Sequence, residues 1–368
     1  MNQEQKFLPQ YDLDQLLLWL KEDGYNCLGP VVRDGAIQYL PITDASDLPV
    51  GVELDQVPAA YQLESTGGDR MFNWSNGPQA LKPILFSPRE TIWQVQQDSS
   101  GKLTFSQMDK SVEPTAVIGV RACDLAALEL QDRHFLAPGA EDPHYKKRRD
   151  SLLLIGVDCS QPSDTCFCAS TDDGPDLRSG FDLGMTELED GFVLRVGTNR
   201  GQKILNALKL ADASETQQQQ AAIQNEQSSI RQRRELPDAG IQKLLLQRSG
   251  HPHWQQIAER CTACGSCTSV CPTCFCFSEH SETNLDATVS QQVREWSSCF
   301  VSNHSYFHGH PVRADIASRY RQWLTHKLAG WQEQFGRSGC VGCGRCISWC
   351  PVGIDITQEL TKLVVDAE

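Results

Sequence analysis

The feature that most constrains this chain is a cysteine pattern that occurs twice. Residues 261–272 read CTACGSCTSVCP and residues 340–351 read CVGCGRCISWCP, so both follow C-x2-C-x2-C-x3-C-P. Three thiolates at this spacing bind one face of a [4Fe–4S] cubane, and the fourth cysteine, which precedes proline, ligates the other cluster. The pattern therefore predicts two [4Fe–4S] clusters with crossed ligands. The predicted ligands are Cys261, Cys264, Cys267 and Cys350 for cluster 1, and Cys340, Cys343, Cys346 and Cys271 for cluster 2.

The two motifs favour iron–sulfur clusters over zinc, and electron transfer over catalysis. Zinc sites close with four ligands in paired knuckles and do not require this spacing twice, with a proline after each last cysteine. Gly265 and Gly344 permit the tight turns between the first cysteines. Two clusters that exchange ligands must lie close together, and full thiolate ligation leaves no open iron for a substrate. We therefore interpret this part of the chain as an electron conduit and predict no catalytic residue in it.

Cysteine content and charge narrow the class of protein. The chain has sixteen cysteines, and residues 1–15 lack the charged head and apolar run of a signal peptide. No stretch has the roughly eighteen consecutive apolar residues of a membrane span. Because the cytosol keeps thiols reduced, we expect a cytoplasmic protein whose cysteines serve metals and not disulfides. The net charge of −14 argues against nucleic acid or anionic lipid as a partner, so we expect protein partners.

Four further cysteines follow two apolar runs that are typical of buried strands. Cys123 comes just after residues 116–120, and Cys159 just after residues 152–157. If the runs form neighbouring parallel strands, both thiols lie at the sheet edge where α/β folds build their sites. Cys166 and Cys168 follow within a few residues. The four thiols could bind a third cluster, or they could be small buried hydrophobic residues near a turn.

The remaining cysteines and a group of histidines are less informative. Cys274, Cys276 and Cys299 could bind a further cluster with a fourth ligand from elsewhere, or pack around the ferredoxin clusters and tune their potentials. Cys27, which we place in a loop, is interpreted as an ordinary thiol. The histidines are His304, His308 and His310. They are spaced like metal ligands, but their loop is rich in Ser, Asn and Gly, so we expect them on the surface.

The expected fold is an α/β N-terminal domain followed by a mostly α-helical, ferredoxin-like C-terminal domain with two [4Fe–4S] clusters. We predict domain boundaries of 1–210 for the first and 237–368 for the second, with a polar helical linker at 211–236 and a long insertion at 272–339. The insertion should cover one side of the ferredoxin module and dock it to the first domain or to a partner. Apolar patterns predict strands at 83–86, 91–95, 102–106, 116–120 and 152–157, and helices at 14–21, 125–130, 241–247 and 313–331.

Short motifs along most of the chain resemble a known family, the β subunits of cytoplasmic NiFe sulfhydrogenases and the related iron–sulfur subunit of anaerobic sulfite reductase. The family's usual RPCD is RACD here, which changes the turn but keeps the cysteine. The resemblance lies in GVRACD at 119–124, GVDC at 156–159, TCFCAS at 165–170, GP at 174–175, GFDL at 180–183, CPTCFCF at 271–277, WSSC at 296–299 and CVGCGRC at 340–346.

The resemblance implies a non-catalytic iron–sulfur subunit of an oxidoreductase complex. Its partners would be the small and large subunits of a NiFe hydrogenase together with a flavin-containing, NAD(P)H-reactive subunit, or the sirohaem subunit of a sulfite reductase. The sequence has no G-x-G-x-x-G that opens a helix after a strand and no P-loop, so we expect no nicotinamide or flavin bound to this chain. An alternative of another class is an iron–sulfur enzyme that carries out thiol or disulfide chemistry at an N-terminal cluster.

Overall fold

Two continuous apolar runs form the centre of the main sheet in the computed structural model, which describes residues 5–79, 81–108, 111–237 and 240–365. The first residues of the chain, 1–4, lie outside the described residues. The runs form β8 and β9, which pair in parallel in a sheet of order β1-β11-β10-β9-β8-β2-β3. The strands are β1 (Lys6–Pro9), β2 (Asn26–Arg33), β3 (Ala36–Pro41), β8 (Thr115–Val120), β9 (Leu152–Val157), β10 (Leu183–Glu187) and β11 (Gly191–Val196).

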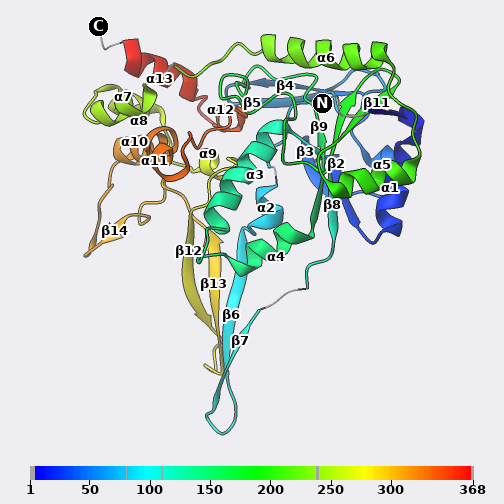
Figure 1. The fold of residues 1–368 in the computed structure, drawn as a ribbon. Helices are drawn as coiled ribbons and strands as arrows, with labels where there is room; N and C mark the ends of the chain where they lie inside the picture. The colour runs from blue at the N-terminus through cyan, green and yellow to red at the C-terminus, as the bar shows by residue number, and fades with distance from the viewer. Residues whose placement is uncertain (1–4, 80, 109–110, 238–239, 366–368) are drawn as a thin grey trace.

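Helices cover both faces of this sheet, as the apolar runs predict (Figure 1). On β8, Ala116 and Ile118 pack with the helices of one face, and Val117 and Val120 pack with those of the other. The first face is covered by α1 (Leu13–Glu22) and α5 (Asn199–Leu208). The second face is covered by α2 (Lys82–Leu85), α3 (Ala122–Phe135) and α4 (Pro143–Ser151). The α/β architecture of this region is therefore confirmed.

Two local predictions in the N-terminal region are wrong. Residues 83–85 belong to the short helix α2 and not to a strand, because Pro83 lies in the first turn, where proline favours a helix, and Leu85 and the following Phe86 are buried against the sheet. Cys27 lies in β2 and not in a loop, and it is buried in the core. Burial raises the pKa of its thiol. Neither error affects a predicted metal ligand.

The polar segment after α5 forms one helix that lies along the main sheet. This helix is α6 (Glu215–Ile230), and a capping box between Ser214 and Gln217 fixes its start. Its Ala221 and Ser228 are buried, and the Ser228 hydroxyl donates to the carbonyl of Ser160, just beyond β9, at 2.8 Å. The helical prediction is confirmed. The proposed boundaries of the linker and of the two domains remain a prediction.

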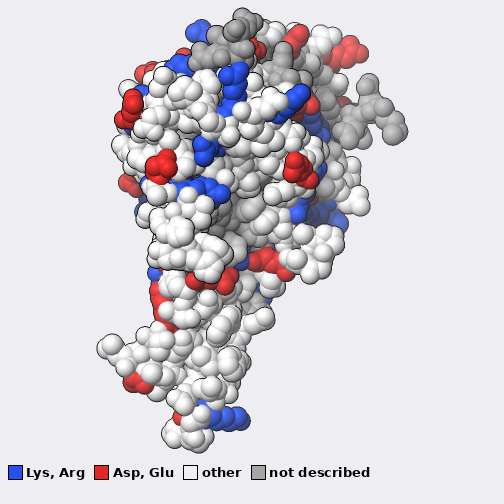
Figure 2. Space-filling view, turned by 90° about the vertical axis from the view of Figure 1, so that its left-hand side faces the viewer, with Lys and Arg blue, Asp and Glu red and all other residues white. Residues whose placement is uncertain are grey.

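A second sheet joins the two halves of the chain. It is antiparallel, in the order β12-β13-β6-β7, and β13 pairs with β6. Figures 1 and 2 show it as a narrow arm that projects from the body, and the face drawn in Figure 2 is mostly uncharged along the arm. The insertion between the cysteine motifs therefore docks to the N-terminal region, one of the two outcomes expected. The strands are β6 (Arg89–Gln97), β7 (Leu103–Gln107), β12 (Phe277–Thr283) and β13 (Val289–Trp296).

The C-terminal region is not clearly mostly helical, which corrects the expected fold class. Besides its helices it contains β12, β13 and a small hairpin of β14 (Tyr306–Phe307) and β15 (His310–Pro311). Apolar periodicity did not indicate β12 because nearly all of its residues are exposed, so pairing with β13 and not burial defines the strand. The helices are α7 (Ile241–Gln247), α8 (His253–Arg260), α9 (Ser266–Ser269), α10 (Ile316–Thr325), α11 (Trp331–Phe335), α12 (Arg345–Ser348) and α13 (Ile356–Val365).

The predicted helix at 313–331 corresponds to α10, the π-helical segment η3 (His326–Gly330) and the start of α11. Tyr320 and Trp323 are buried in the core of this region. A separate hairpin of β4 (Val52–Val57) and β5 (Ala60–Ser65) lies against α12. Short 3-10 turns occur at η1 (Gln10–Asp12) and η2 (Ala45–Asp47). Among the described residues, no helix combines the length and apolar character needed to cross a membrane.

Candidate metal centres

The first cysteine motif and Cys350 border one cavity. All four cysteines predicted for cluster 1 line it, together with Cys346 of the second motif. The other walls are largely apolar and include Phe300, Tyr320 and Trp323. Backbone amides point at the sulfurs: Ala263 donates to Cys261 Sγ at 3.4 Å, and Ile354 donates to Cys350 Sγ at 3.3 Å. Crossed ligation requires this placement of the last cysteine beside the first three of the other motif.

The cysteines predicted for cluster 2 also lie together, around Cys346. Burial raises the pKa of the Cys346 thiol, and the charges of Cys340, Cys343 and Cys271 raise it further. Cys271 thus lies with the second motif, although it belongs to the first. The two groups adjoin, because α9 and α12, which carry Cys267 and Cys346, pack against each other.

The predicted glycines take the backbone conformation that the turns need, and one has a second role. Gly265 and Gly344 have φ of +77° and +74°, a region that side chains rarely adopt. A Cβ on Gly344 would also lie 2.4 Å from the carbonyl oxygen of Thr165. The loop of the second motif therefore packs directly on the loop that carries Cys166 and Cys168, and the Phe167 amide donates to the Gly342 carbonyl at 2.8 Å.

The four N-terminal cysteines converge beside the second motif. Burial raises the pKa of the Cys168 thiol, and the charges of Cys166, Cys159 and Cys343 raise it further. Burial also raises the pKa of the Cys123 thiol, and the charges of Asp124, Cys168 and Cys343 raise it further. All four thiols are buried. The structure thus brings together the residues of the predicted third cluster, next to a ligand of cluster 2, and their ligation remains a prediction.

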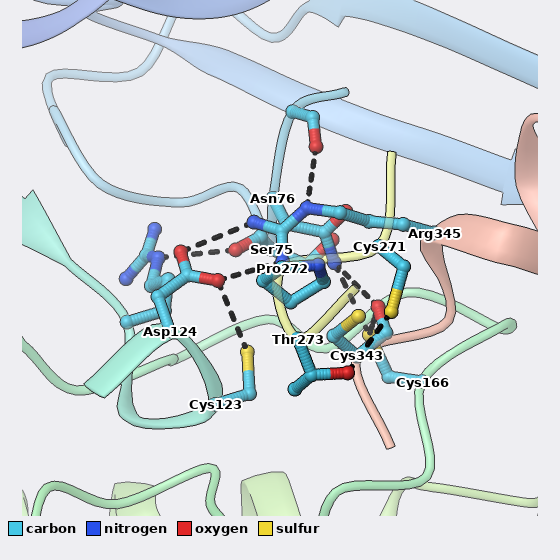
Figure 3. A network of polar contacts seen from close by, with 12 residues as sticks. Ser75, Asn76, Cys123, Asp124, Cys166, Cys271, Pro272, Thr273, Cys343 and Arg345 are labelled. Carbon is cyan, nitrogen blue, oxygen red and sulfur yellow. Dashed lines mark hydrogen bonds and ion pairs between the residues drawn. The ribbon is translucent and has the colours of Figure 1, made fainter. Parts of the chain in front are cut away.

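A buried ion pair fixes this junction (Figure 3). Arg345, in the second motif, contacts Asp124 at 2.6 and 3.1 Å and donates to the Gly77 carbonyl at 2.8 Å. Both charged side chains are only 1% exposed. Asn76 donates to the Cys343 carbonyl at 2.9 Å. These contacts position the second motif against α3 and the loop that carries Asn76 and Gly77.

Sequence reasoning missed a contact from the polar segment to Cys168. Gln232, two residues beyond α6, donates from Nε2 to Cys168 Sγ at 3.3 Å and accepts from the Ala169 amide at 3.0 Å. Gln232 lies in the segment that the sequence predicts to be a polar helical linker. The glutamine-rich composition of the segment gives no local signal for this single contact, which depends on the tertiary fold.

The remaining predicted residues lie at the base of the arm. Cys274, Cys276 and Cys299 border a second cavity with Trp323, Trp331 and two titratable residues, His326 and Lys327. A hydrogen bond from Cys276 lowers the pKa of the Cys299 thiol to about 7, against the effect of burial and with the help of Lys327. His304, His308 and His310 are exposed, as expected. Of the three, His304 reaches Cys276 and Cys299.

A buried lysine, Lys327, indicates that this region can hold negatively charged clusters. Lys327 is 4% exposed, and its ammonium group donates to Thr273 Oγ1 at 2.7 Å and to the Gly339 carbonyl at 3.3 Å. Burial alone would lower its pKa, but the negative charges that Cys271, Cys274 and Cys340 carry when they are thiolates outweigh burial and raise it. A buried ammonium group requires a nearby negative charge, and thiolate-ligated clusters would supply it.

Lys327→Met is therefore expected to lower the reduction potential of cluster 2. A unit charge about 8 Å from a redox centre, at an effective dielectric constant of about 20, contributes about 2 kcal/mol, or about 90 mV for one electron. Removing positive charge disfavours the reduced form, so the potential becomes more negative. A redox titration followed by EPR measures the shift.

The matched control for this substitution is Lys362→Met on α13, whose side chain is 54% exposed. It should leave both potentials unchanged because solvent screens its charge. Equal potentials in the Lys327→Met variant and the wild-type protein would contradict this role of Lys327. The residue could have been noticed in the sequence as a lysine within an otherwise apolar stripe that includes Leu324 and Leu328.

Comparison with known proteins agrees with this geometry. The sequence model of the 4Fe-4S dicluster domain family matches residues 260–354. No solved structure matches the chain significantly. The fold and the site thus define an iron–sulfur protein with a 4Fe-4S dicluster domain and an N-terminal α/β region.

The resemblance seen in the short motifs is also confirmed. The chain is 29% identical to sulfhydrogenase 2 subunit beta of Pyrococcus furiosus over 292 residues, which are 77% of this chain and 82% of the relative. It is thus similar to a sulfhydrogenase β subunit over most of its length, and together with the dicluster domain this similarity supports the role of an iron–sulfur electron-transfer subunit.

Proposed function

We propose that this chain relays electrons between the NiFe subunits of a hydrogenase and a flavin-containing, NAD(P)H-reactive subunit. The observation that carries the proposal is the adjacency of two groups of four cysteines, one of which lines a single largely apolar cavity. When bound, [4Fe–4S] clusters supply one-electron chemistry at potentials that their surroundings set. Similarity to the β subunit of a sulfhydrogenase supports the hydrogenase context.

Within this proposal the residues of the chain have three tasks. The eight ferredoxin cysteines hold the clusters as thiolates. Apolar side chains such as Trp323 and Phe300 limit the access of water to cluster 1. Lys327 and Lys82 place positive charge inside the protein near Cys271, where Lys82 donates to the carbonyls of Thr268 and Ser269 at 3.2 and 3.0 Å.

The N-terminal cysteines extend this proposal toward a partner. Cys123, Cys159, Cys166 and Cys168 adjoin Cys343, so a third cluster there would lengthen the same conduit. All four are buried, so a thiol substrate has no direct access to them. Electron transfer does not require such access. This favours the relay over an enzyme with thiol or disulfide chemistry.

The test is to purify the chain without oxygen, alone and with its co-expressed partners. Alone, it should contain about eight irons or more, with matching sulfide, and should show EPR signals on reduction but turn over neither hydrogen nor NAD(P)H. With its partners, NAD(P)H-dependent hydrogen turnover should appear. Turnover by the chain alone, or zinc without sulfide, would overturn the proposal. Co-purification of a sirohaem protein in place of NiFe subunits would assign the chain to a sulfite reductase.

A further inference from the structure

Two cysteines outside the ferredoxin motifs meet a histidine at the base of the arm. The donor atoms of Cys276, Cys299 and His304 all lie within 4.8 Å of one another. The pairing of β12 with β13 brings the two cysteines together. Phe277 of β12 pairs with Trp296 of β13, and Cys276 and Cys299 lie just beyond this end of the hairpin. The Ser297 amide donates to the Cys276 carbonyl at 2.8 Å and closes the end of the hairpin.

The spacing of these donors fits one metal ion better than a cubane. Ligands at about 2.0–2.3 Å from a tetrahedral ion lie about 3.3–3.8 Å from one another. Within the part of the chain that the structure describes, this is the only group of three or more His, Cys, Asp or Glu donors so closely spaced. The ferredoxin cysteines, whose predicted ligand is a larger cluster, do not approach one another in threes within this limit.

The three donor residues differ in burial, so a metal ion bound to them would contact the protein core on one side and solvent on the other. Cys299 is buried, Cys276 is half-buried and His304 is exposed. The two thiols border the cavity that His326 also lines, so a fourth ligand could be this imidazole or a water molecule. Two thiolates and an imidazole are a donor set that Zn²⁺ prefers.

We propose that Cys276, Cys299 and His304 bind one divalent transition-metal ion, with Zn²⁺ as the best fit. The ion ties the loop that carries His304 and the β14–β15 hairpin to the base of the arm. This site is distinct from the two ferredoxin clusters and does not depend on the partners of the chain. It gives Cys276 and Cys299 a structural role that the relay itself does not need.

The experiment measures zinc and iron together in protein produced with added zinc and purified without oxygen. The wild-type protein should hold about one zinc per chain in addition to its iron. X-ray absorption at the zinc edge should show two sulfur ligands and at least one nitrogen ligand. His304→Ala should weaken zinc binding more than about tenfold and leave the iron content unchanged. Because His304 is exposed, this variant should fold normally.

The matched control is His308→Ala, in the turn of the adjacent β14–β15 hairpin and also exposed, which should retain zinc. Cys299→Ser is the second variant and should lose zinc without losing iron. The proposal is overturned if the wild-type protein binds no zinc, or if His304→Ala and His308→Ala hold it equally. It is also overturned if Cys299→Ser loses about four irons, because the thiols would then ligate a further cluster.

Discussion

Cys350→Ala is expected to remove about four irons from the chain and to abolish the same EPR signal as Cys261→Ala. Cys350 belongs to the second motif by sequence, but it lies in the cavity of the first, beside Cys261, Cys264 and Cys267. Cys271→Ala should by the same reasoning abolish the other signal, the one lost in Cys340→Ala. Iron analysis and EPR of the four reduced variants check this pairing.

The matched control for the ligand variants is Cys27→Ala. Cys27 is buried in β2, and the described structure places it in the core of the N-terminal sheet, apart from the ferredoxin cysteines. The Cys27→Ala variant should retain all of its iron and both EPR signals. Uncrossed ligation would be indicated if Cys350→Ala and Cys340→Ala lost the same signal. The proposed crossed ligand sets would then be wrong.

Asp124→Asn is expected to lower the free energy of unfolding by about 3–5 kcal/mol. The substitution leaves the Arg345 guanidinium buried without its charged partner, and such an uncompensated charge is far more costly than a lost surface contact. The loss should appear as a lower midpoint of urea unfolding, followed by circular dichroism of the cluster-loaded protein. Since the pair joins α3 of the N-terminal region to the second motif, the variant should also lose iron more quickly.

The control for Asp124→Asn is Glu129→Gln, on the same helix. Glu129 pairs with Arg133 at the surface, where an ion pair contributes about 1 kcal/mol or less. The double variant Asp124→Asn with Arg345→Met should regain part of the lost stability, because it removes the unpaired charge. Equal effects of Asp124→Asn and Glu129→Gln would show that the pair contributes little.

The sequence alone predicted the parts of this molecule that depend on local patterns. Spacing indicated the eight ferredoxin cysteines, and continuous apolar runs indicated β8 and β9 with both faces buried. The same reasoning placed Cys123 and Cys159 just beyond these strands, where the structure brings them together with Cys166 and Cys168.

The missed features depend on partners that are distant in sequence. β13 is a strand because it pairs with β6, about two hundred residues earlier, and its own residues carry little apolar alternation. The pairing of Asp124 with Arg345 and the contact of Gln232 with Cys168 likewise join remote segments. His304 was correctly expected at the surface, but only the hairpin register of β12 and β13 brings Cys276 and Cys299 within its reach.

The sheet shared by β6 and β13 has a consequence for biosynthesis. The β6–β7 hairpin leaves the ribosome early, whereas its partner strand is made only after most of the chain has been translated. Until then one edge of β6 has unsatisfied backbone groups, which is a common starting point for aggregation. This edge therefore stays open during much of synthesis, and the second cysteine motif is translated only after the strand that closes it.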